Sequence, residues 1–166
     1  MSQLYQQYAE ELSSVCYRYV TSEPDARDVL QNSFVKIFTA ITSLDYRGEE
    51  ALRAWMKRVV ANEALRFLRD RRKMRFVEHI EEQKILPPVA DDDPQPELLS
   101  PDMLHRLISE LPVGYRTVLN LYVFESYSHQ QIAQLLGITE STSASQLYHA
   151  KRLLAKRIKE LTNDKR

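Results

Sequence analysis

Residues 128–154 read SHQQIAQLLGITESTSASQLYHAKRLL, and this stretch decides the fold of the second half of the chain. Ser128 opens a capping box, because an N-cap hydroxyl is followed three residues later by Gln131. Gly137 stands where a helix ends with a positive φ, and Thr139 can cap the helix that follows. Two capped helices joined by a glycine turn are the plan of a helix-turn-helix.

The second helix of this motif carries a polar face. Its early exposed positions are expected to be Ser141, Thr142, Ser145, Gln146 and His149. Side chains of these types form hydrogen bonds with base edges, and Lys151 and Arg152, which follow, suit phosphates. Leu147, Ala150 and Leu154 recur at helical spacing and are predicted to form the inner face. The motif therefore favours DNA binding over a plain helical hairpin with a polar face.

Outward from this motif, the chain divides at an acidic, proline-rich segment. Residues 78–102 contain five of the seven prolines and eight acidic residues against one lysine. Proline removes a backbone donor and clustered carboxylates repel one another, so a packed element is not expected there. We predict an all-α chain with a helical domain over 1–77, a linker over 78–102 and the helix-turn-helix domain over 103–166.

The N-terminal domain shows three helical patterns of apolar residues. Leu4 to Tyr19 gives the first, Val29 to Ile41 the second, with Ser22 as N-cap, and Leu52 to Phe67 the third. The third runs to about Lys73 and is basic, since residues 51–77 hold nine Lys or Arg against two Asp or Glu. Such blocks are the electrostatic footprint of a polyanion partner.

Composition excludes several other classes of protein. The 166 residues have a net charge of zero, only 3 glycines and a single cysteine, Cys16, which excludes an internal disulfide. No apolar run approaches a membrane span and the N-terminus does not read as a signal peptide, so we expect a soluble cytoplasmic protein with no membrane insertion. The four histidines are scattered and no phosphate loop is found, so neither an enzyme, a metal nor a cofactor is expected.

Aromatic residues alternate with cations around the third helix. Tyr46, Trp55 and Phe67 are interleaved with Arg47, Arg58, Arg66 and Arg69. Aromatic platforms with cations suit unpaired bases and their backbone, although Trp55 and Phe67 can also be core residues of an amphipathic helix.

The order of these parts resembles an extracytoplasmic-function (ECF) sigma factor, a two-domain bacterial transcription initiation factor. Residues 25–38, DARDVLQNSFVKIF, are similar to region 2.2, which in the family docks on the β′ clamp helices of RNA polymerase. Arg47-Gly48, Trp55, Arg58 and Asn62 are similar to regions 2.3 and 2.4, which melt the −10 element. Leu111-Pro112 to Leu154 is similar to region 4, which reads the −35 element.

The resemblance implies three sets of contact residues in this sequence. The expected polymerase contacts are Asp25, Asp28, Leu30, Gln31, Asn32 and Phe34. The expected −10 contacts are Tyr46, Arg47, Trp55, Arg58, Asn62, Arg66 and Arg69, with Tyr46 and Asn62 holding flipped bases. The expected −35 contacts are Ser141, Thr142, Ser145, Gln146, His149, Lys151 and Arg152. The implied partners are core RNA polymerase, through the β′ clamp helices and the β flap, and promoter DNA; an anti-sigma factor is a further candidate.

The sequence departs from the family pattern at three places. Asn32 follows Gln31 where the family usually has glutamate, and Ser143 stands where the helix-turn-helix usually has valine. Ala144, Gln146 and His149 replace arginines common on the recognition helix, which suggests a distinct −35 sequence.

Two alternatives remain beside this reading. A stand-alone helix-turn-helix regulator of duplex DNA would explain 128–157, but not the aromatic and basic third helix or the linker. A helical scaffold without nucleic acid is disfavoured by the separated basic blocks.

Overall fold

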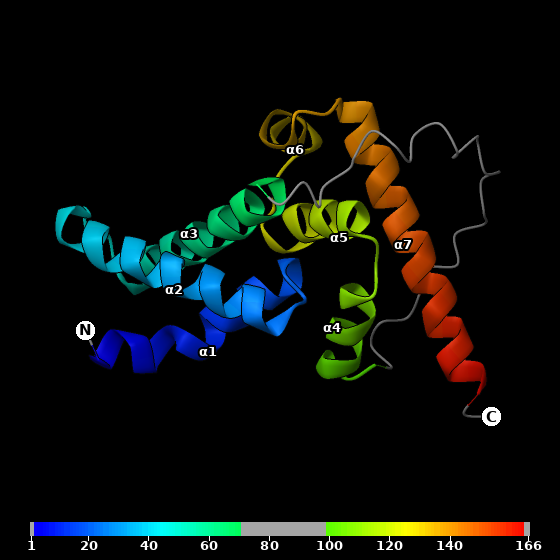
Figure 1. Cartoon of the computed structure of the whole chain (residues 1–166). Coiled ribbons are helices and arrows are strands. Elements are labelled where there is room, and N and C mark those ends of the chain that lie inside the picture. The colour runs from blue at the N-terminus through cyan, green and yellow to red at the C-terminus, as the bar shows by residue number, and fades with distance from the viewer. Residues whose placement is uncertain (1, 71–98, 165–166) are drawn as a thin grey trace. The chain divides into compact units, whose positions relative to one another are not determined.

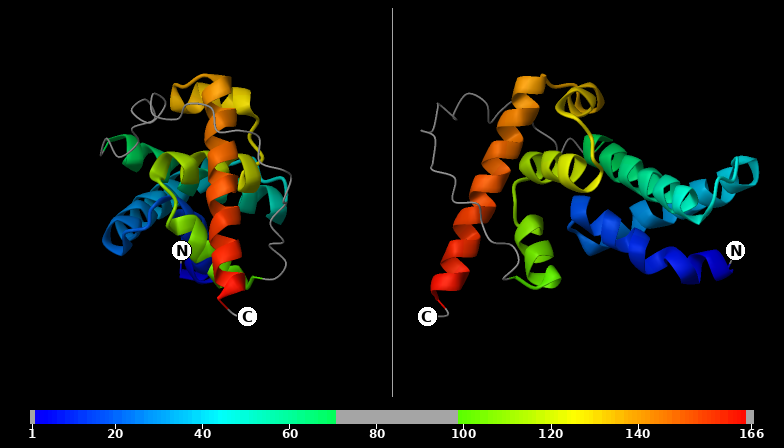
Figure 2. Two further views of the ribbon diagram at one scale, coloured as in Figure 1. Left: turned by 90° about the vertical axis from the view of Figure 1, so that its right-hand side faces the viewer. Right: turned by 180° about the vertical axis from the view of Figure 1, so that it is seen from behind.

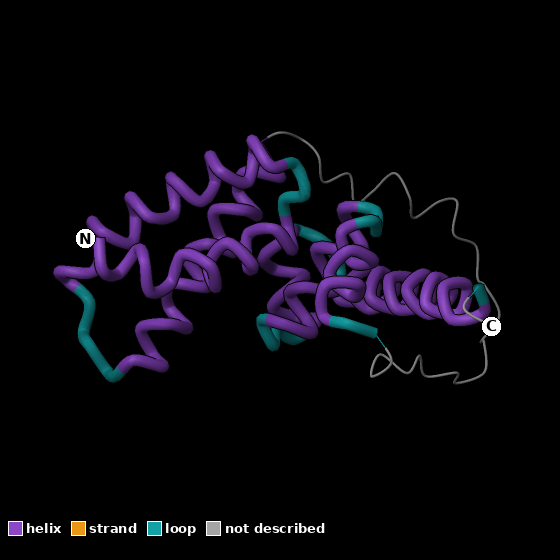
Figure 3. The backbone as a smooth tube through the Cα atoms, turned by 90° about the horizontal axis from the view of Figure 1, so that it is seen from below, coloured by secondary structure: helices purple, strands orange, loops and turns teal. Residues whose placement is uncertain are grey.

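The computed structural model describes residues 2–70 and 99–164, and within these ranges the elements are helices joined by loops (Figure 3). The all-α prediction is therefore confirmed. The chain separates into two compact units between Lys73 and Met74. We call residues 2–70 unit 1 and residues 99–164 unit 2, and describe each by itself. Most of the predicted linker, and the basic residues Arg71 to Arg75, lie outside the described residues.

Unit 1 consists of three long helices. They are α1 (Ser2–Tyr19), α2 (Glu23–Ala40) and α3 (Glu49–Asp70), with the short 3-10 helix η1 (Ile41–Ser43) after α2 (Figure 1). Ser22 is the N-cap of α2 as predicted, with Pro24 in the first turn, although its hydroxyl makes no capping hydrogen bond. Gly48 precedes α3 with a φ of 105°, a conformation that suits glycine.

The three helices pack on one another along their apolar faces. The core of unit 1 is built from side chains of all three, and its largest fully buried members are Leu12, Val15, Tyr19, Ile37, Met56, Val60 and Leu65. In α1 they lie three and four positions apart and in α3 four and five, while in α2 Ile37 follows the buried Val29 and Ser33 at intervals of four. Each helix therefore has one buried stripe. The opposite stripes are left for other partners.

Helix α3 is also held by ion pairs from both neighbours. Glu11 of α1 lies 3.4 Å from Nε of Arg53 and 2.6 Å from Nζ of Lys57. On the other side, Nζ of Lys36 in α2 pairs with Oε1 of Glu63. Two of the cations of α3 are therefore already neutralised by α1.

Unit 2 contains the helix-turn-helix. Its elements are α4 (Pro101–Ser109), α5 (Val113–Leu119), the π-helical turn η3 (Asn120–Phe124), α6 (His129–Leu136) and α7 (Glu140–Asn163). Figure 2 shows α6 beside the N-terminal end of the long α7. The buried side chains of α7 include Leu147, Ala150 and Leu154, as predicted.

The local signals of the sequence are present in unit 2. Ser128 Oγ accepts from the backbone N–H of Gln131, and the Gln131 side chain accepts from the N–H of Ser128. Gly137 ends α6 with φ 67° and ψ 34°, and Thr139 Oγ1 accepts from the N–H of Thr142 at 3.0 Å. The capping box, the glycine turn and the second cap are therefore confirmed.

No helix in the described ranges is both long enough and apolar enough to cross a bilayer. The same residues contain no group of three or more His, Cys, Asp or Glu side chains that could hold a metal ion.

Candidate nucleic-acid and polymerase interfaces

One face of α3 carries most of the residues predicted to contact the −10 element. Trp55, Arg58, Asn62, Arg66 and Arg69 follow one another at intervals of three or four residues, so they form a single stripe along the helix. Trp55 is half-buried and the other four are exposed. We call these five residues the α3 stripe. From Trp55 to Arg69 the helix rises about 21 Å, so the stripe can follow several nucleotides.

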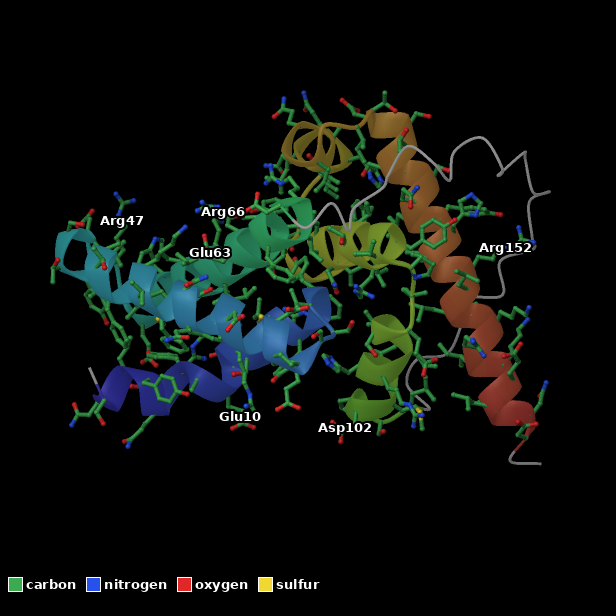
Figure 4. The ribbon with its side chains drawn as sticks, viewed as in Figure 1. Glu10, Arg47, Glu63, Arg66, Asp102 and Arg152 are labelled. Atoms are coloured by element: carbon green, nitrogen blue, oxygen red, sulfur yellow. The ribbon has the colours of Figure 1, made fainter. Side chains whose placement is uncertain are left out.

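The cations of α3 differ in their availability. Arg53 and Lys57 lie off the stripe and are paired with Glu11. Nε of Arg66 lies 3.8 Å from Oδ2 of Asp70 on the same helix. Both side chains are exposed, so this ion pair contributes little to stability. Among the described residues, Arg58 and Arg69 have no carboxylate partner. Positive charge is thus open to a polyanion on the stripe, of which Figure 4 labels Arg66.

A pocket lies where the chain enters α3. Its volume is about 300 Å³, and it is lined by Leu44, Asp45, Tyr46, Arg47, Ala51 and Leu52. Its lining combines apolar side chains with the polar Asp45, Tyr46 and Arg47, a mixture found in small-ligand sites. Tyr46 is 65% exposed, so its ring is available for stacking rather than packed into the loop. Nε of Arg47 lies 3.0 Å from Oδ2 of Asp45, and both side chains are exposed.

The outer face of α2 is polar with one apolar residue. Asp28, Gln31 and Asn32 are exposed there, and Val35, one turn further on, is 59% exposed. We call these four residues the α2 face. Val35 was not predicted from sequence, because a valine in an amphipathic helix is normally assigned to the core. Asp25 and Leu30 are half-buried at the border of this face.

Phe34 corrects one expectation. It was predicted to contact polymerase, but it is buried between α1 and α2, with its ring centroid 4.9 Å from Tyr5 and 5.9 Å from Phe38. Its position, three or four residues from Leu30 and Ile37, places it on the core stripe of α2. Phe34 therefore holds the α2 face in place and does not form part of it.

The exposed face of α7 is offset from the one predicted. Ser141 and Ser145 are exposed as expected, and Tyr148 is 43% exposed. Together with the half-buried Arg152, they form one stripe at helical spacing. Lys151 is exposed beside it, and Thr142 and His149 are half-buried at its border. We call Ser141, Ser145, Tyr148 and Arg152 the α7 stripe. Tyr148 was missed because the sequence argument selected Ser, Thr, Gln, His, Lys and Arg side chains and no aromatic residue.

Gln146 is the second correction. It is 4% exposed, so the expectation that it lies on the exposed face of the helix is wrong. The reason is its position, three residues after the fully buried Ser143 and four before the fully buried Ala150. The amide side chain suggested a contact with a base edge, but the helical period places Gln146 on the buried side of α7.

His149 is held by two tyrosines. Its ring stacks on the buried Tyr115 with centroids 5.8 Å apart and planes at 24°, and meets Tyr148 edge-on at 5.5 Å. Burial, and then the positive charge of Arg152, lower the pKa of His149 below its usual value. The lowered pKa favours the neutral imidazole, whose ring contacts Tyr148 of the α7 stripe.

Comparisons with known proteins match each of the two helical units to a separate family model. Residues 4–74 match the family model of Sigma-70 region 2, and residues 102–154 match that of Sigma-70 region 4. The RNA polymerase sigma factor SigV of Bacillus subtilis is 26% identical over 155 residues, which cover 89% of this chain and 84% of SigV. The ECF sigma-E factor of Haemophilus influenzae is 28% identical over 167 residues, which cover 95% of this chain and 87% of the sigma-E factor.

A solved structure supports the fold. The sigma factor RpoE of Bartonella quintana, crystallised with the anti-sigma factor NepR, aligns with a TM-score of 0.54 at 19% identity, over 95% of this chain and 96% of RpoE. Two helical units that match regions 2 and 4 define a sigma-type transcription initiation factor. The chain belongs to the sigma-70 family of transcription initiation factors, in its extracytoplasmic-function group. As a member it binds core RNA polymerase and promoter DNA.

Proposed function

We propose that the α2 face docks on the β′ clamp helices of core polymerase, while the α3 stripe and the loop pocket capture the opened −10 element. The α7 stripe then recognises the −35 element as duplex. The observation that carries this proposal is that the α3 stripe and the α2 face belong to one compact unit but lie on different helices. Asp28, Asn32 and Val35 of the α2 face line one groove with Arg66 of the α3 stripe, so polymerase bound to α2 would lie next to the strand held by α3.

The strand-opening step needs no covalent chemistry from the protein. Flipping a base out of the stack costs a few kcal/mol, which contacts to the flipped base must offset. Tyr46, which lines the loop pocket, can stack on one base, and Asn62 on the α3 stripe can form hydrogen bonds with another. Arg58, Arg66 and Arg69 then hold the backbone of the melted strand. This role is that of a binding factor and not of an enzyme, acting in the cytoplasm where promoters and polymerase are found.

Unit 2 offers a second surface for polymerase. Tyr122, Val123 and Phe124 of the π-helical turn are exposed apolar residues in sequence, and such clusters often mark protein contacts. We assign this cluster to the β flap. RpoE was solved with the anti-sigma factor NepR, and a protein of that kind is a candidate regulator of this chain.

Transcription from a matched promoter tests the proposal. Core polymerase with this protein should initiate at the promoter, and core polymerase alone should not. A stand-alone regulator of duplex DNA would bind the −35 sequence without polymerase and leave the −10 thymines unreactive to permanganate in every mixture. Permanganate reactivity that depends on both proteins excludes that alternative.

A further inference from the structure

The ion pair between Lys36 and Glu63 joins the helix that we assign to polymerase to the helix that we assign to DNA. Nζ of Lys36 contacts Oε1 of Glu63, and the two residues are 27 positions apart in the chain. The Glu63 side chain is 11% exposed and that of Lys36 48% exposed. The carboxylate is thus largely withdrawn from water, and its pairing with Lys36 matters more than that of a surface pair.

The pair lies beside a groove between the outer sides of α2 and α3. The groove has a volume of about 550 Å³, and its walls include Asp28, Asn32 and Val35 from the α2 face and Arg66 and Asp70 from α3. The apolar side chains of Val29 and Phe67 also line this groove. Lys36 and Glu63 also line the groove and bridge it.

The neighbours of the pair in sequence belong to the two binding surfaces. Lys36 follows Val35 of the α2 face, and Glu63 follows Asn62 of the α3 stripe. A rotation of α3 about its axis that separates Glu63 from Lys36 also moves Asn62 relative to the α2 face. The pair is therefore placed to fix the angle at which the α3 stripe is presented once polymerase holds α2.

We propose that Lys36 and Glu63 are positioning residues, which hold the α3 stripe in register with the polymerase-docking helix so that docking and strand opening act together. This inference rests on the proposed function of the two surfaces. Without Lys36, the nearly buried carboxylate of Glu63 loses its counter-charge, and the helices shift to rehydrate it. Without the Glu63 carboxylate, the charged bridge between the two helices is lost. Polymerase binding then no longer presents Asn62 and Arg58 at the melting strand.

The test uses the full chain with core polymerase and the variants Glu63→Gln, Lys36→Met and the exchange Lys36→Glu with Glu63→Lys. Core affinity is measured by titration, and opening by permanganate reactivity on a duplex promoter and on one with a pre-melted −10 bubble. We expect both single variants to bind core within about twofold of the wild type and to open the duplex roughly tenfold less, a ratio equivalent to about 1.4 kcal/mol. The pre-melted promoter and the exchanged pair should each recover most of the activity.

The matched control is Glu11→Gln. It also removes a carboxylate that pairs with α3, but from α1, which carries no polymerase contact in this scheme. It should lower stability while leaving the duplex-to-bubble ratio near that of the wild type. Normal opening by Glu63→Gln would overturn the proposal, and so would equal losses on duplex and bubble, because these indicate general damage to unit 1. If Glu63→Gln fails to fold, Lys36→Met, which changes the more exposed partner, carries the same test.

Failure of the proposed function gives a different result. If the wild-type protein with core polymerase opens no promoter, the assignment of the surfaces fails before the ion pair is tested. If the wild type opens the promoter and the variants match it, only the positioning role is lost.

Discussion

Nδ1 of His129 lies 2.9 Å from Oγ of Ser143, a hydrogen bond that ties the start of α6 to the first turns of α7. Ser143 is fully buried, and the ring of His129 stacks on Tyr122 with centroids 4.7 Å apart. The helix-turn-helix of this chain is therefore closed by a polar contact, at a position where the resembling family usually has valine.

Removing this hydrogen bond should destabilise unit 2. Ser143→Ala is expected to lower the free energy of unfolding by about 0.5–1.5 kcal/mol, the usual net contribution of one hydrogen bond. Urea denaturation of Ser143→Ala, His129→Ala and the double variant measures the coupling. Strictly additive losses would show that the two side chains do not interact in solution.

The −35 preference should depend on the α7 stripe and not on Gln146. Tyr148→Ala is expected to relax selection at one base position by about 1–3 kcal/mol. Lys151→Ala should weaken binding to all DNA sequences alike, and it should lower the salt dependence of binding by about one counterion. Selection from a randomised −35 library with each variant bound to core polymerase measures this. A changed preference in a stably folded Gln146→Ala protein would contradict the buried placement of that residue.

Strand opening should depend on Tyr46 and Asn62. Both are exposed, so Tyr46→Ala and Asn62→Ala should leave thermal stability, core binding and −35 binding nearly intact. Because stacking on an aromatic ring contributes about 1–3 kcal/mol per base, permanganate reactivity near −10 should fall. A pre-melted bubble should restore it, since the opening cost is then already met. Wild-type reactivity in a stable Asn62→Ala variant would remove the base-capture role of this residue.

Core binding should depend on the α2 face. Asp28→Arg combined with Gln31→Ala, and separately Val35→Asp, are expected to weaken core affinity without a loss of helix content. Phe34→Ala should instead cost about 3–5 kcal/mol of stability, because it leaves a cavity in the core. Pull-down with core polymerase and circular dichroism separate the two effects. Unchanged affinity in the folded Val35→Asp protein would argue against this docking surface.

Cys16 gives a test of the unit 1 core that depends on pH. Burial raises the pKa of the Cys16 thiol to about 12, from an ordinary value of 9.0. The folded state therefore keeps a proton that the unfolded state loses, and this stabilising contribution is present below pH 9 and disappears as the pH rises toward 12. Unfolding measured between pH 8 and 10 should show a steeper loss for the wild type than for Cys16→Ala.

The same thiol should resist modification in the native protein. A maleimide at pH 8 should label Cys16 only in denaturant, because the thiolate is the reactive form and the side chain is fully buried. Rapid labelling without denaturant would mean that α1 opens readily from the rest of unit 1.

Local signals made much of this fold predictable. Ser128, Gln131 and Gly137 act through the backbone within a few residues, so their pattern specifies caps and a turn without knowledge of the rest of the chain. The α3 stripe could be predicted for the same reason, since helical spacing alone brings Arg58, Asn62 and Arg66 onto one face.

The two errors have different causes. Gln146 was selected for its chemistry, although the helical period places it inside. Phe34 was assigned to a surface although its spacing from Ile37 favours the core, and its contact with Tyr5 of α1, 29 residues away, is not visible in the sequence of α2. The contact of Lys36 with Glu63 spans 27 residues, and no local pattern reports which lysine meets which glutamate.

Gly137 shows what kind of constraint the turn places on related sequences. A Cβ added there meets no atom within 4 Å, so the turn has room for a side chain. The φ of 67° is nevertheless left-handed, which asparagine adopts at modest cost and β-branched residues do not. The residue types tolerated at position 137 are therefore limited by the backbone φ and not by the space available for a side chain. Homologous turns should therefore vary among glycine, asparagine and aspartate long before they admit valine or isoleucine.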